Sequence, residues 1–220
     1  MKLFLESAAL DEIRWGLDAR FVDGVYVTPA VLDADAFGVD ALTQVESIAR
    51  VAPVPLLVVV GAIAAEDIYR GGRDLVKVAD NVVAVVPFVE DGITALRRLA
   101  TEGVRTAATF IVTAAQALLA AKAGAAHVCV SVEELEAHGH DPAIALRETR
   151  TLFDRHGIEC ELLAVSAPSS RAVTSAFLAG ADAVATPARV LRALPQHPLT
   201  DRSLDHMLGE LSRRPRGGAR

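Results

Sequence analysis

Short apolar runs rich in Val, Leu and Ile recur along the chain and alternate with longer segments of helical period. Apolar runs of this length, bounded by Gly, Pro, Asn or Asp, are typical of strands buried on both faces in a parallel sheet. They predict strands at 3–6, 24–28, 56–60, 82–86, 106–112, 127–131, 161–166 and 183–186.

The segments between these runs repeat apolar residues every three or four positions, which predicts amphipathic helices. The predicted helices are 10–19, 41–51, 66–78, 93–102, 114–123, 142–156 and 170–179. Glycine follows four of them, at 103, 124, 157 and 180, which suits a left-handed C-terminal cap. Two further helices, 190–194 and 203–211, are expected after the last strand, and the second carries an apolar face that must pack on this domain or on a neighbouring subunit.

Eight strand–helix repeats without a linker-like change in composition predict an α/β fold, a single-domain (β/α)8 TIM barrel with an extra C-terminal helix. A doubly wound open sheet is the alternative. We place the barrel domain at residues 1–212 and a disordered basic tail at 213–220. The tail is interpreted as a solvated end rather than a binding arm.

Composition supports one large domain, since 52% of the 220 residues are apolar and 23% are charged. The net charge is −6, and acidic and basic residues are interspersed along the chain, so we expect no nucleic-acid partner. The longest apolar run, 54–65, is too short to span a bilayer, and the first residues lack a basic-then-apolar leader. We therefore expect no membrane partner and a cytoplasmic protein. Cys129 and Cys160 lie in strand-like runs and are expected to be buried free thiols, with a disulfide or a catalytic thiol as the alternatives.

Several segments resemble the small transaldolase/fructose-6-phosphate aldolase-like family. The match is collinear from residue 1 to about 211 and rests on KLFL at 2–5, DGV at 23–25, ADNVV at 79–83, AAQALLAAKAGA at 114–125 and HPLTD at 197–201. The resemblance implies a (β/α)8 barrel that acts on sugar phosphates through a lysine Schiff base. It also implies self-association into a ring-like homo-oligomer, a pentamer or decamer, with the C-terminal helix reaching a neighbour.

The position that the resemblance assigns to the Schiff-base lysine is Val85. An imine needs a primary amine, and valine has none. The lysines of the chain are Lys2, Lys77 and Lys122, which we expect at the far end of the first strand and on outer helices. Schiff-base aldol chemistry is therefore not expected.

Other positions of the implied site also depart from the family pattern. The strand-one acid is Glu6, the orienting Asn is Thr28, and the Arg expected to hold phosphate is Glu134. The basic residue after the seventh strand is replaced by Pro168, although Ser166 persists. The remaining substrate-binding candidates are Val59, Val85, Ala107, Thr109 and Val112. A glutamate in place of a phosphate-binding arginine disfavours a sugar phosphate.

Glu6 is the catalytic candidate, because a carboxyl among valines should have a raised pKa and could exchange protons near neutral pH. The alternative is a relic carboxylate hydrogen-bonded to Thr28, Thr109 or Ser166. Glu134 is a second acid, a receptor for a cation, or a solvated residue at a helix start. His127 is interpreted as a core histidine facing the outer helices. His138 and His140 could suggest a metal site, but they lie in a loop segment without a carboxylate pair at ligand spacing, so no metal is expected. No cofactor is expected either, since there is no glycine-rich phosphate loop.

Three functions follow from these residues. The first is a repurposed enzyme that condenses or cyclises a non-phosphorylated small molecule bearing an amine or carbonyl. The second is a non-catalytic oligomeric scaffold or small-molecule binder. The third is a sugar-phosphate aldolase or transaldolase of carbohydrate metabolism.

Overall fold

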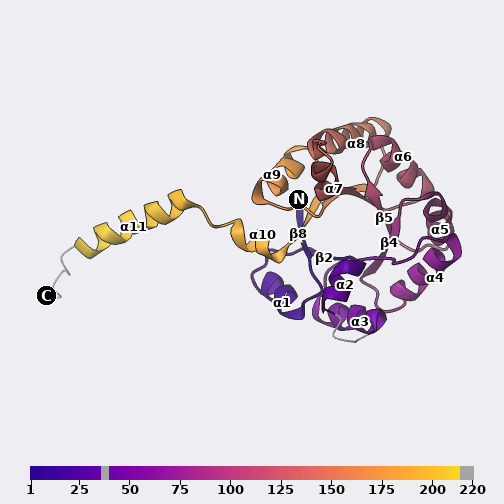
Figure 1. Ribbon diagram of the computed structural model, residues 1–220, viewed down its shortest axis with the longest axis horizontal. Helices are drawn as coiled ribbons and strands as arrows, with labels where there is room; N and C mark the ends of the chain where they lie inside the picture. The colour runs from indigo at the N-terminus through magenta and orange to yellow at the C-terminus, as the bar shows by residue number, and fades with distance from the viewer. Residues whose placement is uncertain (36–39, 214–220) are drawn as a thin grey trace.

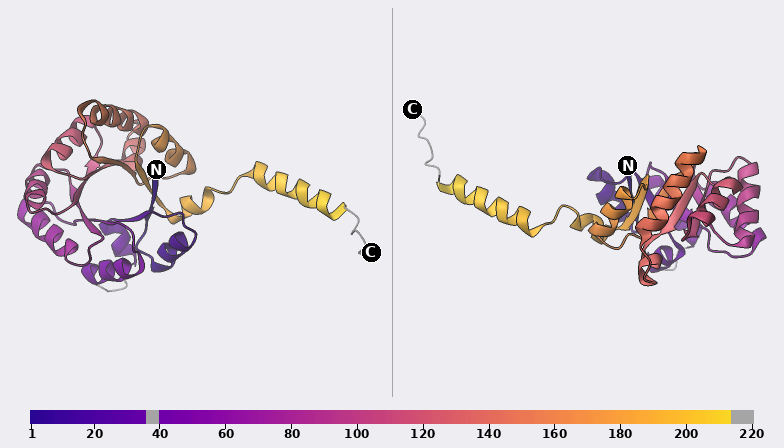
Figure 2. Two further views of the ribbon diagram at one scale, coloured as in Figure 1. Left: turned by 180° about the vertical axis from the view of Figure 1, so that it is seen from behind. Right: turned by 90° about the horizontal axis from the view of Figure 1, so that it is seen from above.

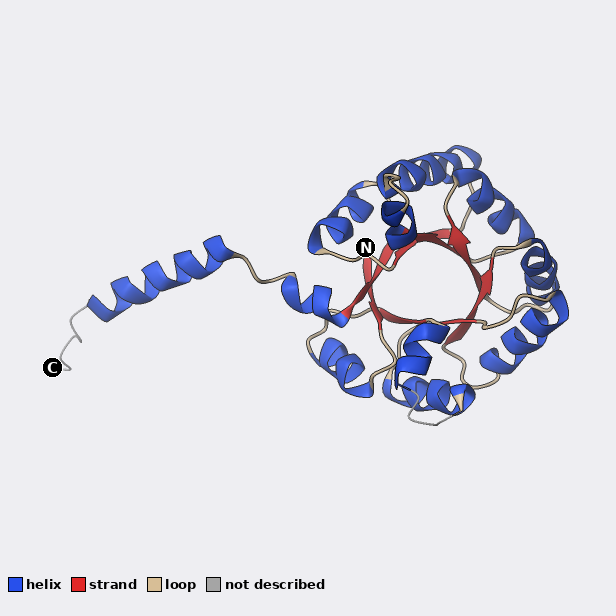
Figure 3. Ribbon diagram, viewed as in Figure 1, coloured by secondary structure: helices blue, strands red, loops and turns tan. Residues whose placement is uncertain are grey.

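Eight parallel strands close into a barrel in the order in which they occur along the chain (Figures 1 and 3). The computed structural model describes residues 1–35 and 40–213, so residues 214–220 of the expected tail lie outside the described residues. The strands are β1 (Lys2–Glu6), β2 (Gly24–Val27), β3 (Leu56–Val59), β4 (Val82–Pro87), β5 (Thr106–Ile111), β6 (His127–Ser131), β7 (Glu161–Val165) and β8 (Ala183–Pro187). The pairing of β1 with β8 closes the ring, which confirms the TIM barrel over the open sheet.

Helices surround the barrel (Figure 1). In chain order, all the helices described are α1 (Leu10–Asp18), α2 (Pro29–Asp35), α3 (Ala41–Val51), α4 (Ala65–Val76), α5 (Glu90–Thr101), α6 (Ala114–Ala123), α7 (Val132–Ala137), α8 (Pro142–His156), α9 (Ser170–Leu178), α10 (Ala188–Ala193) and α11 (Pro198–Arg213), of which α11 lies apart from the barrel. The sequence did not predict α2 and α7, because each is too short to show a helical period and directly follows a strand. The four glycines expected to end helices all have positive φ, between 60° and 104°.

The core has two layers that meet at the strands. Alternate strand residues form an inner cluster made of strand side chains alone, including Phe4, Tyr26, Leu57, Val85 and Cys129. The residues between them pack outward against the helices. Parallel strands that are covered on both faces are apolar along their whole length, which is why these strands could be predicted from the sequence.

The bottom of the barrel, where the strands begin, holds a charged group rather than an apolar layer. Lys2 Nζ lies 2.8 Å from Glu161, and His127 Nδ1 lies 3.3 Å from the other oxygen of the same carboxylate. His127 thus faces the barrel interior, and the expectation that it faces the outer helices was wrong. Burial, together with the charge of Arg105, lowers the pKa of His127 to about 4, so the imidazole is neutral.

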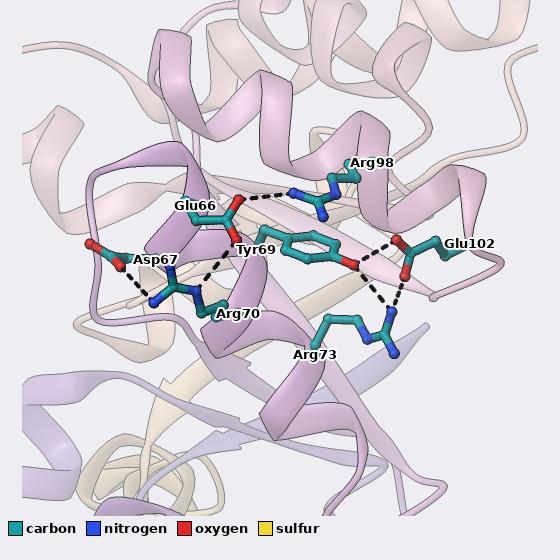
Figure 4. Close-up of polar contacts among 7 residues, drawn as sticks. All are labelled: Glu66, Asp67, Tyr69, Arg70, Arg73, Arg98 and Glu102. Carbon is teal, nitrogen blue, oxygen red and sulfur yellow. Dashed lines mark hydrogen bonds and ion pairs between the residues drawn. The ribbon is translucent and has the colours of Figure 1, made fainter.

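A polar network on the outer surface joins α4 to α5 (Figure 4). The guanidinium of Arg98 lies 3.4 Å from the centroid of the Tyr69 ring, and its Nη1 lies 2.9 Å from Glu66. The Tyr69 hydroxyl donates to Glu102 at 2.7 Å, and Arg73 contacts both groups. These contacts align the two neighbouring helices.

The last helix, α11, extends away from the barrel (Figures 1 and 2). It begins at Pro198, five residues before the predicted start, and it exposes Leu204, Met207, Leu208 and Leu211 to about half of their area. The predicted apolar face is therefore present, and none of residues 1–35 and 40–213 covers it. Among the helices of residues 1–35 and 40–213, none is long and apolar enough to cross a membrane.

Both cysteines are buried free thiols, as expected. Burial raises the pKa of the Cys129 thiol far above its usual range and that of Cys160 to about 12. Because the thiolate is the nucleophile, neither thiol is suited to covalent catalysis in this state.

Candidate functional site

Glu6 ends β1 at the mouth of the barrel, the face formed by the C-terminal ends of the strands. One of its oxygens accepts a hydrogen bond from the Ser166 hydroxyl at 3.0 Å, while Oε2 is buried without a hydrogen-bond partner. Burial raises the pKa of Glu6 to about 7; the Ser166 hydrogen bonds and the charge of Arg189 oppose the rise, and the charge of Glu133 adds to it. A carboxyl with this pKa can both give and take a proton near neutral pH.

Ser166 is held in a left-handed backbone conformation, with φ of 56°, one residue after β7 ends. Such a conformation is uncommon for residues other than glycine, and it is concentrated at sites where a side chain must be aimed. Here the turn presents the hydroxyl to Glu6. Of the three hydroxyls considered as partners for Glu6, the structure brings only that of Ser166 to it within the described residues.

The other two predicted hydroxyls have different partners. Thr28 Oγ1 accepts from the backbone N–H of Val31 at 3.3 Å and so caps the start of α2. Thr109 is buried and lies 3.1 Å from the hydroxyl of Tyr26. Tyr26 was not predicted as a site residue, although the alternation of β2 could have placed it inside the barrel opposite Glu6.

Three predicted apolar residues line the barrel interior. Val59, Val85 and Ala107 all belong to the inner cluster and are at most 5% exposed. Beside them, burial raises the pKa of Tyr26 well above its usual range, so its hydroxyl stays protonated. The space below Glu6 is therefore filled by the protein's own side chains.

None of the three lysines reaches the mouth. Lys2 begins β1 at the opposite end of the barrel and contacts Glu161. Lys77 follows α4 and contacts Asp74 at 2.9 Å, and Lys122 lies in the last turn of α6. The amines that the chain offers are all remote from Glu6.

A cleft of about 660 Å³ opens beside Ser166 at the mouth. It is lined by Phe110, Val112, Ser131, Glu133, Glu134 and Ser166, and we call it the mouth cleft. Glu134 and Val112 were predicted as substrate-binding residues and do lie here. Phe110, Ser131 and Glu133 were missed. Glu133 lies on the short helix α7, which has no periodic signal in the sequence.

The histidines of the loop after α7 give no metal site. His138 Nδ1 lies 2.8 Å from the backbone oxygen of Glu134 and 3.4 Å from its carboxylate. Over the part of the chain that the structure describes, no three side chains of His, Cys, Asp or Glu are grouped so as to hold a metal ion.

Comparison with known proteins gives a consistent result over nearly the whole chain. Residues 36–214 match the family model described as Transaldolase/Fructose-6-phosphate aldolase. A probable transaldolase of Herpetosiphon aurantiacus is 38% identical over 208 residues, covering 94% of this chain and 93% of that protein. Probable transaldolase 1 of Bacillus cereus is 34% identical over 210 residues (96% and 97%), and a probable transaldolase of Heliobacterium modesticaldum is 38% identical over 208 residues (94% and 96%).

Proposed function

This chain belongs to the transaldolase/fructose-6-phosphate aldolase family, and we propose that it works without the lysine Schiff base implied by the resemblance. In this proposal, Glu6 is the acid and base in the condensation or cyclisation of a non-phosphorylated substrate that bears an amine or a carbonyl. The observation that carries the proposal is the Glu6 carboxyl, with a pKa of about 7 and one unpartnered oxygen, at the mouth of the barrel.

The proposed chemistry is the joining of a carbonyl and an amine, both supplied by substrate. The amine adds to the carbonyl carbon and gives a carbinolamine. Protonated Glu6 then donates its proton to the departing hydroxyl, which leaves as water, and the Glu6 carboxylate takes the proton lost by nitrogen. Atoms balance without a redox partner, and the carboxyl ends in the state in which it began.

The acids around the mouth support a substrate without phosphate. Glu133 and Glu134 line the mouth cleft beside Ser166, and a phosphate there would meet two like charges in a partly desolvated space. A cationic or uncharged molecule meets no such cost.

One observation favours the third function, a sugar-phosphate aldolase or transaldolase. Arg189 donates to the carbonyl oxygen of Pro168 at 3.3 Å, so a guanidinium lies at the position where the resemblance places a basic residue. A phosphate could pair with it. This alternative still lacks an amine for the imine.

The second function, an oligomeric scaffold or small-molecule binder, is favoured by two other observations. The barrel interior is closed by Val59, Val85 and their neighbours. In addition, α11 has an exposed apolar face, which we propose docks on a second copy of the chain in a ring-like homo-oligomer.

A thermal-shift panel followed by turnover separates these functions. Sugar phosphates, amines and aldehydes are tested at rising concentration, because a bound ligand stabilises the folded state in proportion to the logarithm of its concentration over Kd. With a stabilising amine–carbonyl pair, Glu6→Gln should abolish imine formation, while the exposed Glu159→Gln at the bottom of the barrel should leave it intact. Unchanged turnover in Glu6→Gln removes Glu6 from the mechanism.

A trapping experiment tests the aldolase directly. Borohydride is added to the protein with a ketose phosphate, and the protein mass is measured. A covalent adduct means that one of the three lysines forms an imine, and the proposal would then give way to the third function.

A further inference from the structure

Phe110 stands in an unusual position on β5. Its φ is 63°, a left-handed conformation that is an outlier for a bulky residue, and its side chain is 58% exposed. The ring is nevertheless part of the mouth cleft. An exposed aromatic ring on a conformationally costly backbone needs an explanation.

The explanation begins with an irregularity in the strand. In a regular strand, alternation would send Ala107 and Thr109 inward, Ala108 and Phe110 outward, and Ile111 inward. Instead, the register against β6 shifts between Ala108 and Ile111, and Ile111 packs in the outer layer with the helices. The shift removes Phe110 from both core layers and turns its ring into the mouth cleft.

The rest of the cleft has the opposite chemical character. Glu133 and Glu134 come from α7, and Ser131 and Ser166 contribute hydroxyls. The carboxylate of Glu134 lies 3.4 Å from His138 Nδ1, and both of these side chains are about two-thirds exposed. No cationic side chain is among the residues that line the cleft within the described part of the chain.

We propose that the mouth cleft binds an organic ammonium ion, with the ring of Phe110 against its alkyl shell and the carboxylates of Glu133 and Glu134 facing its charge. An aromatic face attracts ammonium groups through its quadrupole, and aromatic residues recognise alkylated amines in this way. The inference rests on the proposed function and deepens it, because it adds to the substrate an ammonium group, which has no lone pair and is therefore separate from the amine or carbonyl that reacts. Phe110 then determines specificity, while Glu6 carries the proton transfer.

The test compares binding of choline with binding of 3,3-dimethylbutan-1-ol, an uncharged molecule of the same shape, by titration calorimetry. Choline should bind the wild-type protein more tightly. Phe110→Asn removes the ring, yet asparagine tolerates the left-handed backbone, so this variant should unfold at an equal or higher temperature. Its choline affinity should fall about 2- to 30-fold, and Phe110→Tyr should retain the wild-type affinity.

The carboxylates are tested in the same way. Glu133→Gln combined with Glu134→Gln should weaken choline binding without weakening binding of the alcohol, whereas Glu159→Gln should change neither. Equal affinity for choline and the alcohol, or unchanged choline affinity in Phe110→Asn, would overturn the inference. Absence of choline binding to the wild-type protein would do the same.

These outcomes separate the inference from the proposed function. If choline binds through Phe110 but Glu6→Gln leaves turnover unchanged, the ammonium site stands and the mechanism fails. If turnover depends on Glu6 while choline binds no better than the alcohol, the mechanism stands and the ammonium site fails.

Discussion

The replacement of Glu6 by glutamine gives the sharpest test of the raised pKa of this buried carboxyl. Glutamine has nearly the same shape, and its oxygen can still accept the Ser166 hydrogen bond. The change therefore removes the ionisation of Glu6 and little else. Any pH-dependent difference in stability between the two proteins reports the folded-state pKa of this group.

The size of the expected difference in free energy of unfolding follows from the pKa of Glu6. Burial raises the pKa of Glu6 from 4.5 to about 7, and each pKa unit corresponds to about 1.4 kcal/mol. The ionised carboxylate thus destabilises the folded protein by at most about 3 kcal/mol relative to the protonated acid. For a chain of this size, that is a substantial part of a typical net stability.

Proton binding determines the direction in which the stability difference between Glu6→Gln and the wild type changes with pH. A carboxyl whose folded pKa exceeds its unfolded pKa binds more protons when folded, so its contribution is fully present below pH 4.5 and is lost as the pH rises to about 7. Glu6→Gln should therefore match the wild type in acid and exceed its free energy of unfolding by up to about 3 kcal/mol above pH 7.

The assay is urea unfolding of both proteins across this pH range. The difference in free energy of unfolding should grow by about 1.4 kcal/mol per pH unit and level off above about pH 7. Ser166→Ala removes a hydrogen bond that lowers the pKa of Glu6, so its plateau should begin at higher pH. A difference that is independent of pH would show that Glu6 ionises normally, and the acid–base mechanism would lose its physical basis.

Three further outcomes are expected on other parts of the molecule. A Cβ on Gly92 would lie 1.9 Å from the last carbonyl oxygen of β4, so Gly92→Ala should lower the free energy of unfolding in urea by more than about 2 kcal/mol. Gly103→Asn, where φ is 77° and no atom lies near the added side chain, should leave it nearly unchanged. Equal effects of the two variants would contradict the packing around Gly92. Replacing Arg98 by Met and Tyr69 by Leu, singly and together, should give a coupling of about 0.5 to 1 kcal/mol, and strict additivity of the two changes would mean that their contact is not stabilising. Leu208→Lys places a charge on the exposed face of α11, so light scattering should show a smaller assembly without a lower unfolding temperature; an unchanged mass would count against docking of this face on a second copy.

The regular part of the fold was predictable because its signal is local. Strand β6 and helices α3, α6 and α8 have the predicted bounds. An apolar run marks β6, and runs of helix-forming residues between clear start and stop residues mark the helices. The glycine caps were equally clear, because glycine, which lacks a Cβ, adopts the left-handed conformation more readily than other residues. The short helices α2 and α7 offered no comparable pattern.

The interior of the barrel was predictable from the same alternation. Once eight parallel strands are assumed, every second residue must face inward, which correctly placed Val59, Val85 and Ala107. The alternation was misapplied to His127, which shares the inward face with Cys129 two residues later. Tyr26 was within reach of the same reasoning.

The contacts at the mouth of the barrel could be identified only from the tertiary structure. That Ser166, 160 residues away along the chain, is the hydrogen-bond partner of Glu6 depends on the closing of the ring and on a left-handed turn after β7. The raised pKa of Glu6 depends on burial by several strands at once. The ring of Phe110 reaches the mouth cleft through a register shift that strict alternation forbids. The sequence alone thus determined the strands, the longer helices and the valine at position 85, because these are local properties of the chain. Which side chains meet at the mouth was decided only when the barrel closed, because those contacts join residues that are far apart in the sequence.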